Sequence, residues 1–72
     1  MKANDQVFHK KSHYFGRLVF ERIVLDTVYW LVEFEIPGFS KRTLRREFWD
    51  IRNIILVESE QHKLSLRLKY SD

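Results

Sequence analysis

Residues 28 to 36 read "VYWLVEFEI", and their side chains alternate in character along the chain. One set is Val28, Trp30, Val32, Phe34 and Ile36, and the other is Tyr29, Leu31, Glu33 and Glu35. Because successive side chains of a strand point to opposite faces, this period of two predicts a half-buried strand with the first set inward. Pro37 and Gly38 follow, and both residue types are common in turns.

The residues before this strand carry a weaker strand pattern. Residues 14–25, "YFGRLVFERIVL", are rich in β-branched and aromatic side chains, which favour strands. Their alternation slips along the segment, so we expect a long bent strand with a bulge near Gly16 or Arg22. Residues 26–27 are then the tight connection to the next strand, and residues 6–10, "QVFHK", are a short first strand.

The residues after position 53 also predict strands. "IILVES" at 54–59 is an apolar run typical of a buried strand, and 60–62 form a polar turn. "KLSLRLKY" at 63–70 alternates again. Its inward set is Leu64, Leu66, Leu68 and Tyr70, and its outward set is Lys63, Ser65, Arg67 and Lys69. The sequence therefore predicts an all-β chain, or a mainly β chain with one short helix, of five to six strands.

Length and composition limit the class of protein. A chain of 72 residues makes one domain, residues 1–72, with a core built from few side chains. The chain has no cysteine, which excludes disulfides and thiolate metal sites, while 44% hydrophobic residues are enough for folding. No apolar run is long enough for a signal peptide or a membrane span. We therefore expect a cytoplasmic protein that does not bind membranes.

Residues 40–53, "SKRTLRREFWDIRN", can be interpreted as a strand or as a helix. As a helix, Leu44, Phe48 and Ile51 form an apolar stripe at helical spacing. However, that helix begins with several cations, which the helix dipole disfavours at its amino end. As a strand the alternation is mediocre, although threonine and aromatic residues suit a sheet.

The order of segments favours the strand. Residues 14–53 resemble the Tudor and related SH3-like small barrels, in which a hairpin, a "L-V-x-F" strand and a polar strand follow one another. In that family an acidic residue and an apolar residue, here Asp50 and Ile51, stand in a single helical turn before the closing strand. The resemblance implies a small SH3-like barrel and a strand over the basic segment. The strand expected at 63–70 lies beyond the usual five.

The basic segment is the candidate binding site. Its excess of cations over Glu47 and Asp50 equals the net charge of the whole chain, +3. Arginine donates paired hydrogen bonds to phosphate or carboxylate, and an indole offers a face on which a base can stack. The candidate binding residues are Lys41, Arg42, Arg45, Arg46, Trp49 and Arg52, with Lys10 and Lys11 from the first loop. They predict a non-catalytic module that contacts nucleic acid.

Two alternatives stay open for the same residues. The arginines can pair with carboxylates across a sheet while Trp49 closes the core, so that the segment has only a structural role. The chain can also be a protein-interaction subunit that binds an acidic partner, or that forms a homodimer through edge strands or through exposed Tyr29 and Leu31.

Enzymatic and metal-dependent functions are not expected. The chain has no cysteine nucleophile, no glycine-rich phosphate loop and no serine in a nucleophile-elbow context, so we expect no catalytic residues and no cofactor. His9, His13 and His62 are the only imidazoles. Their spacing along a strand and loop does not favour a metal site, so we interpret them as surface or loop residues.

Overall fold

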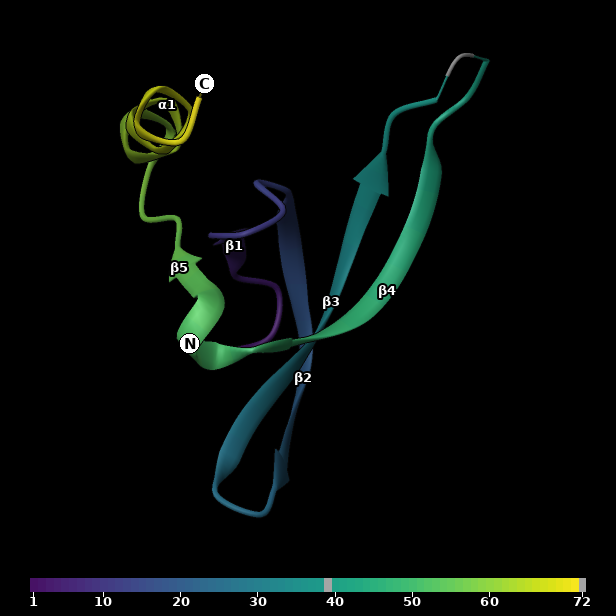
Figure 1. The fold of residues 1–72 in the computed structure, drawn as a ribbon, viewed down its shortest axis with the longest axis vertical. Coiled ribbons are helices and arrows are strands. Elements are labelled where there is room, and N and C mark those ends of the chain that lie inside the picture. Colours follow the sequence, from purple (N-terminus) through teal and green to yellow (C-terminus); the bar gives the residue numbers. More distant parts are fainter. Residues whose placement is uncertain (39, 72) are drawn as a thin grey trace.

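The computed structural model describes residues 1–38 and 40–71. Its elements, in chain order, are β1 (Gln6–His9), β2 (Phe15–Val24), β3 (Thr27–Ile36), β4 (Thr43–Asp50), the 3-10 turn η1 (Ile51–Asn53), β5 (Ile54–Leu56) and α1 (Glu60–Lys69). All strand pairs are antiparallel, and the strand order is β4-β3-β2-β1-β5. The described part of the chain is thus mainly β, with one short α-helix, as the sequence predicts. Figure 1 shows a strongly twisted sheet, with α1 and the β2–β3 turn at opposite ends of the molecule.

The strand predicted from "VYWLVEFEI" is confirmed as β3. Trp30, Val32 and Phe34 are buried, whereas Tyr29 and Leu31 on the other side are half-buried. The buried set joins side chains of the other strands in one core: Val7, Leu18, Trp30, Val32, Phe34, Trp49 and Ile54. We call the opposite side of the sheet its outer face.

The basic segment forms strand β4, which confirms the strand and not the helix. β4 pairs with β3 along its whole length, from Thr43 opposite Ile36 to Asp50 opposite Tyr29. The chain then turns through η1, where Asp50 Oδ1 accepts a hydrogen bond of 2.9 Å from the Arg52 amide. This side-chain cap satisfies an amide at the start of the turn and ends the strand.

Strand β2 contains the expected irregularity, but at a different residue. The register with β3 shifts between Leu18 and Phe20, and not near Gly16 or Arg22. Because Val19 is the extra residue, Leu18 points into the core while Phe20 points to the outer face. Gly16 has another role, because a Cβ there would overlap Val32 Cγ1 inside the core.

The strand predicted at 63–70 is wrong, because these residues form helix α1. Ser59 caps the helix by accepting a hydrogen bond of 3.0 Å from the His62 amide. Leu66 is buried and Tyr70 half-buried, four residues apart on one side, while Leu64 and Leu68 are exposed. Capping and the high helix propensity of Glu, Gln, Lys, Leu and Arg therefore outweigh the alternation of leucines.

Helix α1 covers one part of the outer face. The ring of Tyr70 lies 5.1 Å from that of Phe8, and Lys63 and Arg67 lie over the ring of Phe15 at 5.1 and 5.4 Å. Phe8 and Phe15 are opposite each other in β1 and β2. The helix therefore buries an apolar region that β1 would otherwise expose.

Candidate interaction surface

The basic residues predicted within 41–52 lie in three places and on both faces of the sheet. Lys41 and Arg42 precede β4, Arg45 and Arg46 are within it, and Arg52 is in η1. Arg45 pairs with Phe34, on the core side, whereas Arg46 pairs with Glu33, on the outer face. Successive residues of β4 cannot share one contact surface, so the structure separates these two arginines.

Three of the predicted arginines form ion pairs with carboxylates on neighbouring residues. Arg46 Nη2 lies 2.9 Å from Glu33 Oε2, and Arg42 Nη1 lies 3.1 Å from Glu35 Oε2. Arg52 Nη2 lies 2.6 Å from Asp50 Oδ2. Lys41 and Arg45 form no ion pair within residues 1–38 and 40–71.

Two of the paired carboxylates, Glu33 and Asp50, have lowered pKa values. Hydrogen bonds from Arg17 and then Arg46 lower the pKa of Glu33, and hydrogen bonds from Arg52 lower the pKa of Asp50 to about 2. The same contact with Asp50 raises the pKa of Arg52. These arginine side chains are largely exposed, so each pair contributes little to stability. Their effect is to neutralise cations that would otherwise be available to a ligand.

Trp49 is a core residue and cannot offer the stacking face that the sequence suggests. Its side chain is 4% exposed, it pairs with Trp30 across β3 and β4, and its ring lies 5.1 Å from that of Phe34. Its Nε1 donates a hydrogen bond of 3.1 Å to Glu47 Oε1. The ring of His9 meets its edge at 4.7 Å, and burial lowers the pKa of His9.

Lys10 and Lys11 lie in the connection between β1 and β2, and Lys10 reaches the 3-10 turn. Lys10 Nζ donates a hydrogen bond of 3.2 Å to the Arg52 carbonyl, and the Lys10 amide donates one of 2.9 Å to that of Asn53. The structure therefore places the Lys10 ammonium against the backbone of Arg52, whose guanidinium is paired with Asp50. Arg42 and Arg46, on the β3–β4 side, instead pair with Glu35 and Glu33.

The structure also shows an apolar surface that the basic residues do not indicate. Five side chains on the outer face of β2, β3 and β4 form it, and we call them the apolar face: Phe20, Val24, Tyr29, Leu31 and Phe48. Phe20, Leu31 and Phe48 stand in one row across the three strands. Phe20 and Phe48 are 44% and 43% exposed, and their rings meet edge to face at 5.8 Å. Two partly exposed phenylalanines side by side make a surface that water solvates poorly.

A hollow of about 340 Å³ opens at one end of the apolar face. Its walls are Arg22, Val24, Tyr29 and Phe48. The Arg22 guanidinium carbon lies 5.2 Å from the centre of the Phe48 ring, over its face. Arg22 forms no ion pair with any residue that the structure describes. The hollow thus combines apolar walls with one cation that has no carboxylate partner.

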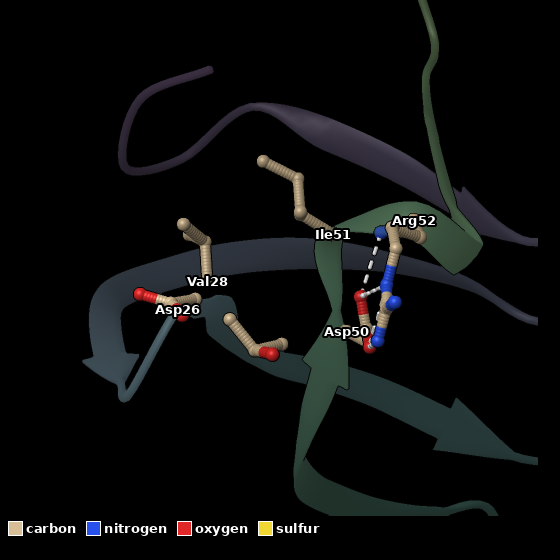
Figure 2. Close-up of a pocket in the computed structure, with 6 residues that line it drawn as sticks. Asp26, Val28, Asp50, Ile51 and Arg52 are labelled. Carbon is tan, nitrogen blue, oxygen red and sulfur yellow. Dashed lines mark hydrogen bonds and ion pairs between the residues drawn. The ribbon is translucent and has the colours of Figure 1, made fainter.

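A second and smaller hollow, of about 150 Å³, lies between the β2–β3 turn and η1. Figure 2 shows Asp26 and Val28 on one side of it and Asp50, Ile51 and Arg52 on the other. The bidentate contact of Arg52 with Asp50 occupies the carboxylate there. No three metal-ligating side chains gather anywhere among the described residues. The geometry of this hollow indicates no particular ligand.

Part of the apolar face was recognisable in the sequence. The alternation of β3 places Tyr29 and Leu31 outward, and two large side chains of this kind on an outward face indicate an interaction surface. Phe20 joins them only because the bulge at Val19 reverses its face, and Phe48 only because β4 is a strand in this register. Neither condition can be read from local periodicity.

No protein-family model, curated protein sequence or solved structure matches the chain. Over residues 1–38 and 40–71, no helix is both long and apolar enough to cross a membrane. Function is therefore inferred from the surface itself.

Proposed function

We propose that this chain is a non-catalytic protein-interaction module whose apolar face binds a partner protein. The observation that carries the proposal is the exposed row of Phe20, Leu31 and Phe48 on the outer face of the sheet. Aromatic residues and arginine are enriched at protein interfaces, and a few of them supply most of the binding energy. Burying this row against a partner removes apolar surface from water and stabilises the complex.

The charges around the apolar face favour an acidic partner. Arg17 and Arg46 share the single carboxylate of Glu33, at 2.9 Å each, so this group carries a surplus positive charge. Arg22 adds a second surplus charge beside the hollow. A partner segment with carboxylates complements both charges, whereas a second copy of this chain would bring cations of the same sign together.

The same geometry gives less support to nucleic acid as the ligand. Single-stranded nucleic acid is bound by aromatic rings that stack on bases along a continuous cationic groove. Here the indole of Trp49 is in the core, and the rings of Phe20 and Phe48 meet edge to face instead of offering a series of separate stacking faces. Contact with nucleic acid through Lys41, Arg45 and the lysines of the first loop stays a prediction.

We also propose that the sheet belongs to the SH3-like class of small barrels. The five-stranded antiparallel sheet, and the turn η1 between β4 and β5, support this proposal. Such barrels often serve as interaction modules, which is consistent with a partner on the outer face. A cytoplasmic location stays a prediction from the sequence, and cell fractionation tests it.

Retention of partner proteins on immobilised chain tests the proposed function. The test variant is Phe20→Ser with Phe48→Ser, and the matched control is Leu64→Ser with Leu68→Ser, two exposed leucines on α1. We expect specific proteins to be retained from a cell lysate after nuclease treatment, by the wild type and the control but not by the test variant. Retention that disappears with nuclease, or that the test variant keeps, contradicts the proposal.

Light scattering on the purified chain separates self-association from binding to another protein. We expect a monomer at high concentration, because the surplus cations on the outer face repel those of a second copy. A stable dimer that Phe48→Ser dissociates would make the apolar face a homodimer interface, and the proposal of a different protein as partner would then be wrong.

A further inference from the structure

We infer that the hollow beside Arg22 accepts one bulky apolar side chain of an acidic partner segment, and that Arg22 binds a carboxylate next to that side chain. This inference rests on the proposed function and names what the apolar face recognises. Side chains of three strands line this open hollow: Val24 and Arg22 from β2, Tyr29 from β3 and Phe48 from β4.

The size and walls of the hollow indicate an apolar side chain. Its volume of about 340 Å³ falls at the lower end of the range for ligand pockets, roughly 300–1,000 Å³. The walls offer an aliphatic group from Val24 and rings from Tyr29 and Phe48. A side chain such as leucine, phenylalanine or tryptophan buries apolar surface against all three walls.

The placement of Arg22 indicates a carboxylate beside that side chain. Its guanidinium carbon lies over the Phe48 ring at 5.2 Å, a cation–π contact, and Arg22 forms no ion pair with the residues that the structure describes. A planar guanidinium donates two parallel hydrogen bonds to a carboxylate. Asp50 pairs with Tyr29 from β4 as Arg22 does from β2, and its carboxylate is bound by Arg52 at 2.6 Å, so it does not compete for Arg22.

The β2–β3 turn extends the apolar surface past the hollow. Leu25 at the turn is 92% exposed and has φ 55°, a backbone conformation in which glycine or asparagine is far more common. Ile23 beside it is 64% exposed. Both water and the local backbone disfavour leucine at position 25. A partner segment that runs from the hollow along the turn would cover Leu25, whereas Ile23 pairs with Val28 on the core side of the sheet and lies outside this contact.

A selection from a phage library of short random peptides tests the inference with the full chain as target. We expect enriched peptides to carry a bulky apolar residue within one or two positions of Asp or Glu. Synthetic copies of these peptides should bind about tenfold more weakly to Arg22→Gln, which removes one charge-assisted contact. Replacing the acidic residue of the peptide by its amide should weaken binding to the wild type by a similar factor and have little effect on Arg22→Gln.

The matched control is Arg45→Gln, because Arg45 also forms no ion pair with the described residues but lies on the core side of β4. We expect its peptide affinity to equal that of the wild type. Tryptophan fluorescence of each variant checks that the core around Trp30 and Trp49 is intact.

The outcomes separate this inference from the proposed function. Peptides that bind the apolar face, lose affinity with Phe48→Ser and are insensitive to Arg22→Gln would overturn the inference and keep the proposed function. Enrichment of peptides that are insensitive to both substitutions, or no enrichment together with tight binding of a labelled oligonucleotide, would overturn both. Enriched apolar peptides without acidic residues would overturn the role of Arg22.

Discussion

Gly16 lies where β2 crosses the core, opposite Val7 on one side and Phe34 on the other. A Cβ at this position would overlap Val32 Cγ1 and would lie 3.1 Å from the Glu33 carbonyl oxygen. Val32 is fully buried, so its side chain cannot move away into solvent. We therefore expect Gly16→Ala to destabilise the fold, although alanine suits a strand better than glycine does.

The size of the effect follows from overpacking of a small core. One extra carbon that forces neighbours to shift costs about 1–3 kcal/mol, out of a total stability of about 5–15 kcal/mol. For a domain of this size each kcal/mol lowers the melting temperature by about 4–8 °C. Gly16→Ala should therefore melt about 4–24 °C below the wild type.

Urea denaturation followed by tryptophan fluorescence measures this change, because both tryptophans are buried in the core. The companion variant is Val32→Ala, which removes the overlapping methyl and alone costs about 2 kcal/mol. In the double variant the new methyl at position 16 occupies part of that space. The loss of stability of the double variant should therefore be smaller than the sum of the two single losses by about 1 kcal/mol or more. An unchanged midpoint for Gly16→Ala, or strictly additive costs, would refute this account of the core.

Four further outcomes are expected. Trp49→Ala should lower the free energy of unfolding by about 3–5 kcal/mol, measured by urea denaturation, and an unaffected stability would show that the indole is not in the core. Leu25→Gly should raise stability by about 0.5–1 kcal/mol, because glycine adopts the positive φ of the turn without strain, and a loss in thermal melting would contradict that. The folded state lowers the pKa of Asp50 from 3.8 to about 2, so the stability that its charged form contributes is present above pH 3.8 and is lost as the pH falls through 2. In acid denaturation, Asp50→Asn should lack this loss of stability. Burial lowers the pKa of His9 below 6.5, so the wild type should lose stability as the pH falls below 6.5, whereas His9→Gln should show a flatter profile in pH-dependent melting.

The sheet was predictable where each strand has one buried and one solvated face. The alternation of β3 is strict, and its buried set Trp30, Val32 and Phe34 is the one that the pattern assigns. β4 was ambiguous by pattern alone, because it is an edge strand: of its residues only Trp49 is buried, so no face of β4 shows a clear period. Its pairing with β3, which is a tertiary contact, decides its conformation.

The carboxyl-terminal helix was not predicted because its leucines alternate by chance. Leu64 and Leu68 are exposed, and only the spacing of Leu66 and Tyr70 by four residues reflects the contact with the sheet. Ser59 and Glu60 are an N-cap and an acidic first-turn residue, which together indicate a helix start. A local signal was present, and the alternation of the leucines obscured it.

The candidate site was predictable only in part, because charge counted along the sequence ignores the partners that folding supplies. Arg46 and Arg52 looked available in the sequence, yet Glu33 and Asp50 meet them in the structure. The sequence left Trp49 open as a stacking residue or as a residue that closes the core, and its position in β4 turns it inward. Arg22, outside the basic segment, is the arginine that stays without a carboxylate beside an apolar hollow.

The ion pairs of Glu33 with Arg17 and Arg46 cross the outer face between the region under α1 and the apolar face. They limit the contact area of a partner to the part of the sheet between this charged row and the β2–β3 turn. An interface of standard size takes about 800 Å² from each protein, roughly one seventh of the 5515 Å² that this chain exposes. We expect a contact confined to one part of one face to be smaller, and interfaces below standard size are typical of transient complexes. The association is therefore suited to rapid exchange of partners, and its lifetime would increase where several copies of the recognised segment occur in one partner.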